Sequence, residues 1–524
     1  MRTADIYLNV HFKRGQQGLP LERVYKHLFD PELYLRAYGR IYRNAGATTK
    51  GTTEETVDGM TLQKIHKIIA LLKMEQYEWT PVRRTEIPKA NGKKRPLGIP
   101  TWSDKLLQEV LRSLLEPYYE PRFSNHSHGF RPERSCHSAL REIQSQWKGT
   151  TWFIEGDIKG CFDNSDHEIL LSIIRRDIHD DRLLRLLNGL VKAGYVADWT
   201  WHENAAGTPQ GGIISPLLSN IYLDELDRFF EDTLRLLYNR GDKRQWNPEW
   251  TRIQHRKDAA WKAGDRSLWK QLWWEQRKIP SFDSCDPDYR RLRYVRYADD
   301  FLLGFVGPVS EAREIRDRVG EFLRDNLKLT LSAEKTLITH ASDDRARFLG
   351  YEIKTAREGS LITGGKRATN GRIQLLVPQD VVSKYHARYS RNGKVIHRAE
   401  LLNESDYTII QRYQSVLRGL HNYYCMAFNV GKRMSSIKRI LRTSLLKTLA
   451  SKLRRKLPQI IKMYRVPNQK FTTFRKTVER PGKKPLVAEF GGMGCTTWFA
   501  AERARSYTGW VKPVGSFDRS SERS

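Results

Sequence analysis

The feature that most restricts the fold of this chain is a pair of adjacent acids at the turn of an apolar hairpin. Residues 293–306 consist of two β-type runs around a tight turn that carries Asp299 and Asp300. Adjacent carboxylates repel each other, and a folded protein commonly offsets that repulsion with a divalent cation. Two consecutive acids on their own are more often a solvated polar turn, so a metal site needs a second acidic position.

A second acid stands at the end of another predicted strand. Residues 152–157, Trp-Phe-Ile-Glu-Gly-Asp, predict a short strand that ends at Asp157. Glu155 would share its sheet face, because alternate strand residues point the same way, so pleating does not separate the two acids. We select Asp157 because it stands at the strand end. Two strand-end acids on one sheet can share a pair of Mg²⁺ ions about 3.5–4 Å apart, the usual arrangement for displacement at a phosphate.

The charge balance indicates a polyanionic partner. The 524 residues include 91 Lys and Arg against 60 Asp and Glu, a formal net charge of +31, which favours nucleic acid or an anionic membrane. No apolar run approaches the ~18–20 residues of a membrane span, and no secretory signal opens the chain. The five cysteines form no Cys-x-x-Cys pair, which excludes a zinc ribbon and disfavours a disulfide framework. We therefore expect an intracellular nucleic-acid-binding protein.

Three strings occur in the order found in reverse transcriptases: Asp157-Ile-Lys-Gly-Cys-Phe-Asp, Gly207-Thr-Pro-Gln-Gly-Gly-Ile-Ile-Ser-Pro and Tyr297-Ala-Asp-Asp. The flanking text resembles the reverse transcriptases that group II introns encode. It comprises Arg95-Pro-Leu-Gly-Ile-Pro, His128-Gly-Phe-Arg-Pro, and Ala333-Glu-Lys-Thr followed by Phe348-Leu-Gly-Tyr. The resemblance runs from about residue 20 to about 480, and the ordered set is highly specific.

The resemblance implies an α+β fold of the right-hand polymerase type. Fingers and palm, with an antiparallel palm sheet packed on helices, would be followed by an α-helical thumb or maturase domain. The expected divisions are a helical extension of the fingers at 1–85, fingers and palm at 86–370, the thumb at 371–478, and a residual DNA-binding segment with a disordered tail at 479–524. A segment at about 231–290, with six of the 14 tryptophans, is expected to be an inserted helical element.

The resemblance also assigns roles to single residues. Asp157 and Asp299 would hold two Mg²⁺ ions, Asp300 would support them, and Ile158 is a further expected metal contact. Lys335 would approach the leaving pyrophosphate as a general acid, with an ordinary surface lysine as the alternative. The expected nucleotide contacts are Lys94 and Arg95 for the triphosphate, Phe162 as a steric gate against a 2′-hydroxyl or as ordinary core packing, and Gln210 and Gly211 beside the nucleotide and primer–template.

The thumb region is acid-free. No Asp or Glu occurs between Tyr407 and Val478, and apolar residues at a three-to-four spacing from Met434 to Leu453 predict an amphipathic helix with a cationic face. Such a face binds a phosphate backbone without reading sequence. The expected RNA contacts are Arg412, Arg418, Tyr423, Lys438, Arg439, Arg442, Lys447, Lys452, Arg454 and Arg455. Tyr413, Tyr423 and Tyr424 could stack on bases, with helix packing as the alternative. Packing is favoured for at least one of Tyr423 and Tyr424, which are not expected both to face inward.

We therefore expect an RNA-directed DNA polymerase, a two-metal Mg²⁺-dependent nucleotidyltransferase, that is also the maturase of its own group II intron. It would bind intron RNA to assist splicing and copy it into DNA during retrohoming. Its partners would be that RNA, an RNA template with a DNA primer, target DNA and deoxynucleoside triphosphates, without a membrane.

Two alternatives stay open: a non-enzymatic RNA-binding splicing factor and a host-recruited defence reverse transcriptase. The presence of Asp157, Asp299 and Asp300 argues against a non-enzymatic splicing factor. The intact thumb sequence argues against a defence reverse transcriptase. The Cys-x-x-Cys pair and His-rich motif of the family's endonuclease are missing from the sequence, so we expect a form without that endonuclease. The expected location is the bacterial cytoplasm, with an organelle as the alternative.

Overall fold

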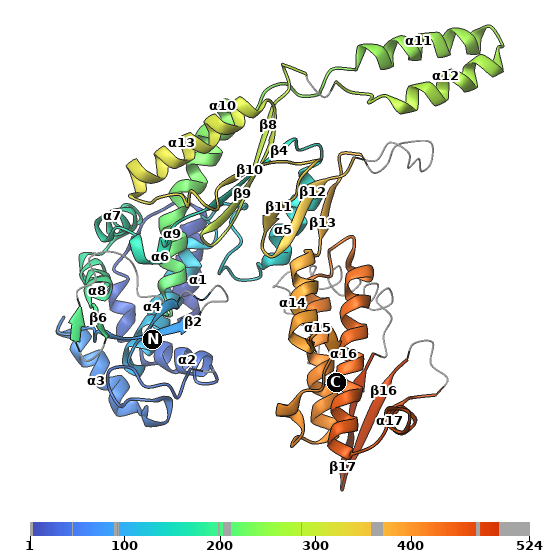
Figure 1. Cartoon of the computed structure of the whole chain (residues 1–524). Coiled ribbons are helices and arrows are strands. Elements are labelled where there is room, and N and C mark those ends of the chain that lie inside the picture. Colours follow the sequence, from blue (N-terminus) through green and yellow to red (C-terminus); the bar gives the residue numbers. More distant parts are fainter. Residues whose placement is uncertain are drawn as a thin grey trace, which may run out of the picture. The chain divides into compact units, whose positions relative to one another are not determined.

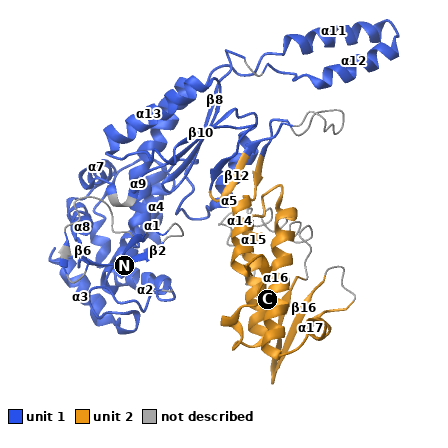
Figure 2. Cartoon of the chain, viewed as in Figure 1, with its two compact units in different colours: residues 1–348, 354–373 blue, residues 349–353, 374–524 orange. Residues whose placement is uncertain are grey.

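The computed structural model describes residues 4–44, 46–88, 92, 94–197, 200–202, 211–283, 286–357, 370–467 and 472–491, without the side chains of Phe162, Asp163 and Trp201 (Figure 1). The chain forms two compact units, residues 1–348 with 354–373 and residues 349–353 with 374–524 (Figure 2). Unit 1 combines sheets with helices and unit 2 is mainly helical, which confirms the α+β class. The expected domain divisions stay predictions.

Unit 1 is built on helices with one apolar face. They are α1 (Ala4–Gln16), α2 (Pro31–Ile41), α3 (Leu62–Lys73), α4 (Trp102–Tyr119), α5 (Cys136–Gln146), α6 (Cys161–Asn164), α7 (His167–Asp177), α8 (Asp181–Lys192), α9 (Ser215–Arg228), α10 (Arg235–Tyr238), α11 (Pro248–Lys262), α12 (Arg266–Lys278) and α13 (Val309–Leu327). Side-chain oxygens of Asp30, Thr101 and Asp180 accept backbone N–H groups at the starts of α2, α4 and α8, which satisfies donors that a helix start leaves open. Helix α4 packs against α1, α2 and α9.

The palm sheet brings the two predicted acidic strand ends together. Its strands are β4 (Trp152–Asp157), β8 (Arg291–Tyr297), β9 (Asp300–Val306) and β10 (Leu337–His340), in the order β10-β4-β9-β8 with every neighbouring pair antiparallel. The strand ending at Asp157 and the acidic hairpin are thus both confirmed. The register places Asp157 opposite Asp300.

A second sheet contains a hairpin that carries Lys94 and Arg95, which we call the basic hairpin. Its order is β3-β2-β6-β7, formed by β2 (Val82–Pro88), β3 (Lys94–Ile99), β6 (Tyr195–Ala197) and β7 (Thr200–His202). Strands β2 and β3 pair antiparallel from Arg83 with Ile99 to Pro88 with Lys94. The remaining strands before α14 are β1 (Leu21–Glu22), β5 (Ile178–His179), β11 (Ala346–Phe348), β12 (Tyr351–Thr355) and β13 (Ile373–Leu376).

Unit 2 is a helical layer with small hairpins. Its elements are α14 (Gln379–Tyr389), β14 (Ser390–Arg391), β15 (Lys394–Val395), α15 (Asp406–Tyr423), α16 (Val430–Leu453), α17 (Leu457–Tyr464), β16 (Phe474–Arg480) and β17 (Lys483–Phe490). Helix α16 buries Met434, Ile437, Leu441 and Leu445, which confirms the predicted amphipathic helix. The β16–β17 hairpin packs on α15, and the amide of Gly491 donates to Oε1 of Gln414 at 3.2 Å. Within the ranges described, no helix is long and apolar enough to cross a membrane.

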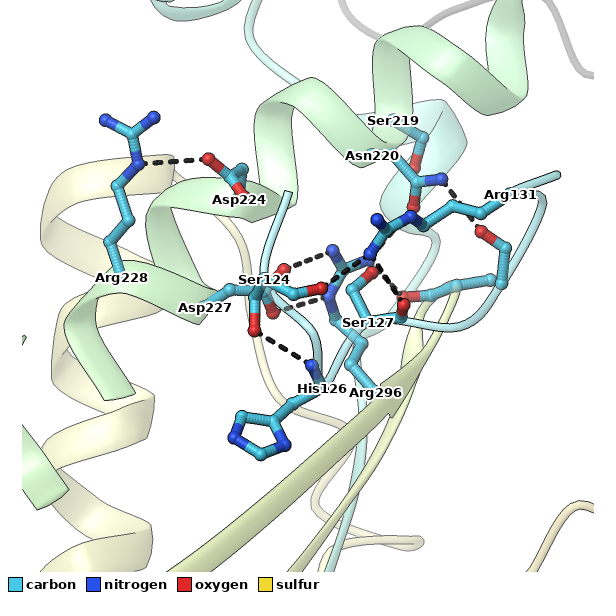
Figure 3. Close-up of polar contacts among 12 residues, drawn as sticks. Ser124, His126, Ser127, Arg131, Ser219, Asn220, Asp224, Asp227, Arg228 and Arg296 are labelled. Carbon is cyan, nitrogen blue, oxygen red and sulfur yellow. Dashed lines mark hydrogen bonds and ion pairs between the residues drawn. The ribbon is translucent and has the colours of Figure 1, made fainter. Parts of the chain in front are cut away.

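A buried ion pair lies behind the acidic turn of the palm (Figure 3). The side chains of Arg296 in β8 and Asp227 in α9 both have 0% exposure, and their Nη2 and Oδ2 atoms lie 2.5 Å apart. Nε of Arg296 and the hydroxyl of Tyr294 donate to Oδ1 of Asp227 at 2.8 Å and 2.6 Å. Although burial acts to lower it, the Asp227 carboxylate raises the pKa of the Arg296 guanidinium above its ordinary value. Each charge therefore depends on the other, because a buried charge without a partner is strongly unfavourable.

The same guanidinium holds the turn itself. Nη1 of Arg296 donates to the carbonyl of Ala298 at 3.0 Å and to Oδ1 of Asn220 at 3.2 Å, and Nδ2 of Asn220 donates to the carbonyl of Gly129 at 2.8 Å. Ala298 has φ +57°, a left-handed conformation that costs a non-glycine residue about 1–2 kcal/mol. A Cβ on Gly129 would lie 2.3 Å from the amide nitrogen of Ala298. Glycine is required there because the two backbones touch.

A second buried arginine fixes the loop that carries Gly129. The guanidinium of Arg131 donates to the carbonyls of Ser124 and Ser127 at 2.5 Å and 2.9 Å. The loop in turn pairs with β8, because the amide of His128 donates to the carbonyl of Arg296 at 2.9 Å. The loop and α9 therefore hold the end of β8 from two sides (Figure 3).

Replacing Gly156 by alanine should destabilise unit 1. Its Cβ would lie 2.0 Å from the ring of Phe301, which is 2% exposed, and an extra carbon in a packed core costs about 1–3 kcal/mol. Gly39, in α2, has no atom within 4 Å of its Cβ position, so Gly39→Ala should raise stability by about 0.5–1 kcal/mol because alanine favours helix. Chemical denaturation followed by circular dichroism compares the two. Equal midpoints would contradict the packing argument.

Asp227→Ala should cost about 3–5 kcal/mol, because it leaves the Arg296 charge buried and unpaired. Asp224, one helical turn earlier, is the matched control. It lies 3.0 Å from Arg228, whose side chain is 44% exposed, and burial together with the charge of Asp227 raises the pKa of Asp224 to about 7. Its removal leaves no buried charge alone, so Asp224→Ala should cost less than about 1 kcal/mol. Similar losses for both variants in thermal unfolding would show that the ion pair is not the anchor.

Candidate active site

Three carboxylates lie together at one end of the palm sheet. Asp157 ends β4, Asp299 stands in the β8–β9 turn and Asp300 begins β9, where it faces Asp157 across the sheet. Burial, followed by the charges of Asp299 and Asp157, raises the pKa of Asp300 to about 7. Burial and the charge of Asp157 also raise the pKa of Asp299. Half-buried like charges of this kind are stabilised by a cation.

The geometry separates Glu155 from Asp157, although the two share a strand face. The carboxylate of Glu155 accepts hydrogen bonds from the hydroxyl of Thr339 at 2.7 Å and from the amide of Arg347 at 2.8 Å. Its two oxygens are therefore engaged by neighbouring structure. Asp157 has its backbone carbonyl tied to the amide of Ser332 at 2.9 Å.

Lys335 reaches the acidic cluster. Its Nζ lies 2.8 Å from Oδ2 of Asp157, and its side chain is 65% exposed. The hydrogen bond to Asp157, with the charges of the other two acids, raises the pKa of Lys335 above its ordinary value. The ammonium group therefore stays protonated at neutral pH and can donate a proton nearby. Its role as a general acid stays a prediction.

The two cations of the basic hairpin are placed differently. Arg95 is exposed on β3. Burial raises the pKa of Asp299 and the charge of Arg95 acts in the opposite direction, so the guanidinium lies within electrostatic reach of Asp299. Lys94 is exposed, with its Nζ 2.5 Å from Oε2 of Glu86. Adjacent strand residues point to opposite faces. Arg95 is therefore the better placed of the two for a phosphate beside the acids.

The other expected nucleotide contacts are only partly described. Gly211 has φ +110°, and a Cβ there would lie 2.3 Å from the carbonyl oxygen of Gly98, so this glycine allows its loop to lie against β3. Gln210 and the side chain of Phe162 lie outside the described residues, and their roles stay predictions. The side chain of Ile158 is 1% exposed, so only its backbone could meet a metal.

The expected RNA contacts in unit 2 fall into two groups. The exposed side chains are those of Arg412, Arg418, Arg439, Arg442, Arg454 and Arg455. By contrast, the ammonium groups of Lys438, Lys447 and Lys452 donate to backbone carbonyls at 2.9 Å, 2.6 Å and 3.3 Å. These three lysines also tether the fold. RNA contact by both groups stays a prediction.

Base stacking by Tyr413 is wrong. Its ring is 2% exposed, and its hydroxyl forms hydrogen bonds with the hydroxyls of Ser444 at 2.8 Å and Thr448 at 3.1 Å. A ring enclosed between α15 and α16 cannot meet a base. Its polar tip serves to join the two helices.

The expectation that Tyr423 and Tyr424 cannot both pack inward is also wrong. Tyr423 donates to the carbonyl of Leu349 at 2.7 Å and Tyr424 to that of Gly350 at 3.3 Å. Both rings pack beside Tyr351, with centroids 5.9 Å and 5.1 Å from it. The reason is that α15 ends at Tyr423, and Tyr424 has turned out of helical geometry with ψ 18°. Successive side chains can then reach the same neighbour. Stacking by Tyr423 on RNA stays a prediction, limited by this contact.

The sequence analysis did not single out the residues that hold the acidic turn: Asn220, Asp227 and Arg296. A signal for them was present, because an arginine inside an apolar strand needs a buried acid. The partner lies in α9, 69 positions away in the chain. That separation is invisible without the fold.

The chain matches two family models in sequence order. Residues 87–353 match "Reverse transcriptase (RNA-dependent DNA polymerase)" and residues 372–490 match "Type II intron maturase". The chain is 41% identical over 474 residues to the group II intron-encoded protein LtrA of Lactococcus lactis, an alignment that covers 86% of this chain and 79% of that protein.

More distant relatives share the same region. The putative COX1/OXI3 intron 1 protein of Saccharomyces cerevisiae is 35% identical, with 81% of this chain and 52% of that protein covered. Protein YkfC of Escherichia coli is 34% identical, with 66% and 86% covered. The acidic palm, the two family matches and the likeness over most of both chains lead to one conclusion: this chain belongs to the group II intron-encoded proteins that combine an RNA-directed DNA polymerase with a maturase.

Proposed function

We propose that the chain extends a DNA primer along an RNA template by two-metal, Mg²⁺-dependent nucleotidyl transfer. The observation that carries this proposal is the meeting of Asp157, Asp299 and Asp300 at one end of the palm sheet, with Arg95 in electrostatic reach of Asp299. Carboxylates gathered at one end of a sheet suit a reaction in which a phosphate is attacked and pyrophosphate leaves.

The three acids fit Mg²⁺. They offer hard oxygen ligands, and the ammonium group of Lys335 already lies as a cation against Asp157. In the described part of the chain, no three His, Cys, Asp or Glu are gathered tightly enough to enclose a metal by themselves. Mg²⁺ does not need such a cage, because it commonly binds one or two carboxylates and completes its shell with water and substrate phosphates. Bound there, it would activate the primer 3′-hydroxyl and neutralise the leaving phosphates.

The remaining residues would arrange the substrates. Arg95 presents a planar fork that suits phosphate oxygens, and protonated Lys335 would donate to the leaving pyrophosphate. Lys94, Phe162, Gln210 and Gly211 would border the triphosphate, the sugar and the primer–template, and the backbone of Ile158 would face the metal.

Unit 2 would bind the intron RNA. Arg418, Arg439 and Arg442 on α15 and α16 face solvent in a stretch without acids, which favours binding of a phosphate backbone. Arg412 pairs at 2.9 Å with Glu404, which precedes that stretch. Binding would assist splicing, and copying of the intron at a target DNA would complete retrohoming.

Asp299→Ala should abolish primer extension on an RNA template with Mg²⁺. Loss of one of the metal-binding carboxylates removes several kcal/mol of transition-state stabilisation, or at least about a thousandfold in rate. Asp344→Ala, which removes an exposed acid of unit 1 outside the cluster, is the matched control and should extend normally. Extension by Asp299→Ala at the normal rate would overturn the catalytic assignment. A preference for ribonucleotides would overturn the assignment of deoxynucleoside triphosphates as the substrate.

The Mg²⁺ requirement should rise as the pH falls. Asp300, with its pKa raised to about 7, is protonated below that pH and charged above it, and a metal binds the charged form. Between pH 8 and pH 6 the Mg²⁺ concentration for half-maximal extension should increase by about tenfold. Extension rates measured over a Mg²⁺ series at each pH test this. A requirement that is the same at both values would rule out competition between proton and metal.

A further inference from the structure

The Trp-rich insertion folds as a helical hairpin with a core of its own. We call residues 246–282 the arm; it contains α11 and α12, which lie side by side (Figure 1). Its buried centre consists of Ile253, Ala260 and Leu272. Buried Gln276 joins the helices, because its amide donates to Oε1 of Gln254 at 2.8 Å and accepts from Nζ of Lys257 at 2.6 Å. Trp269 packs against this centre, whereas Trp246, Trp261 and Trp274 are not part of it.

Three indole rings of the arm remain half exposed. Trp246, Trp261 and Trp274 show 55%, 51% and 49% of their surface to solvent. Aromatic area of this size on one small hairpin is unfavourable in water and marks an interaction surface. The polymerase site uses none of these rings.

Arginines cover indole faces along one side of α12. The guanidinium of Arg266 lies 3.6 Å from the ring centre of Trp261, and that of Arg277 lies over Trp273. Trp269 connects these stacks, with its ring 5.5 Å from Trp261 and 6.3 Å from Trp273. Positions 266, 269, 273 and 277 share one helix face. The result is a row of three indole rings, those of Trp261, Trp269 and Trp273, with a guanidinium over the ring at each end.

The charge of the arm favours a polyanion over a protein. It has eight lysines and arginines against four acids. Of these acids, Asp265 caps α12 and Asp258 accepts from Gln254. Among the residues that the structure describes, no ion pair involves an arginine of the arm. Phosphates would complement this surface, whereas a typical protein surface brings both signs of charge.

A cluster of arginines continues the surface where the arm joins the palm. Arg244 and Arg291 lie over the ring of Tyr289, at 5.2 Å and 4.5 Å from its centre. Burial, together with the like charges of Arg291 and Arg244, lowers the pKa of Arg293 below its ordinary value. A phosphate beside these three side chains would relieve their repulsion.

We propose that the arm is an additional RNA-binding surface, in which the exposed indoles stack on unpaired bases and the arginines bind the flanking phosphates. Base stacking on an aromatic ring suits single-stranded loops and not the interior of a duplex. That the RNA is the intron rests on the proposed function; that the arm binds unpaired RNA does not.

The test uses the full chain and two labelled RNAs, a stem with a single-stranded loop and the blunt duplex of the same stem. Trp261→Ala combined with Trp274→Ala should weaken binding to the stem–loop by about tenfold and leave the duplex nearly unaffected. Leu268→Ala removes a side chain of the arm that is 37% exposed but has no aromatic face, so it should bind as the unaltered chain does. Trp261→Phe with Trp274→Phe should keep most of the affinity, which excludes unfolding as the cause.

A charge pair tests the arginines. Arg266→Gln removes a guanidinium stacked on an indole, while Arg256→Gln removes an exposed arginine of α11 that the structure does not place on a ring. Both lower the net charge equally, so a stacking role predicts the larger loss of stem–loop affinity for Arg266→Gln. Equal small losses would reduce the arm to a general electrostatic contribution and overturn the proposal.

Other outcomes are equally decisive. Unchanged stem–loop affinity in the double tryptophan-to-alanine variant, or an equal loss for loop and duplex, would overturn the proposal, as would lost association with another protein at unchanged RNA affinity. Primer extension on an RNA template separates the two functions. Arm variants should extend normally, and Asp299→Ala should bind the stem–loop normally. If the unaltered chain fails to extend, the proposed polymerase function fails while the binding result still decides the role of the arm.

Discussion

The acidic end of the palm depends on one ion pair that never meets water. Arg296 lies in β8, pairs with Asp227 and donates a hydrogen bond to the carbonyl of Ala298. A buried ion pair gains little stability over apolar packing, but it fixes geometry, because removal of either partner leaves a charge that the interior cannot solvate. Here the geometry that it fixes is the left-handed turn before Asp299. The acidic turn is therefore held from behind by a buried ion pair that lies apart from the three acids.

The turn needs this support because the three neighbouring carboxylates destabilise it. Three carboxylates at the end of two strands are desolvated and repel one another, as the raised pKa values of Asp299 and Asp300 show. A flexible turn would relieve the repulsion by moving apart. The contacts of Asn220, Gly129 and Arg296 prevent that movement. Because the backbone cannot move to separate the acids, their repulsion favours the binding of cations. The ammonium group of Lys335, on an exposed side chain, is one such cation.

Local patterns predicted the elements but not their long-range partners. The hairpin at Asp299, the strand ending at Asp157 and the helix from Met434 to Leu453 follow from periodicity, which depends on neighbours a few positions apart. The pairing of Arg296 with Asp227 and the burial of Tyr413 depend on packing between distant segments. Tyr423 and Tyr424 would point apart in a continuous helix, but α15 ends at Tyr423. Helix ends are decided by tertiary contacts, here those with Leu349 and Gly350.

Net charge shows the same limit in a sharper form. A lysine counts as +1 wherever it lies, yet Lys438 and Lys447 direct their ammonium groups at carbonyls of their own unit, whereas Arg439 and Arg442 on the same helix face solvent. Lysine offers a compact charge that a carbonyl can satisfy, while the guanidinium keeps several donors and a flat face for other partners. The arm follows this division, since two of its arginines, Arg266 and Arg277, lie on indole rings and retain donors at their edges. The cations that matter for RNA are therefore better identified by what their side chains leave unsatisfied than by their number.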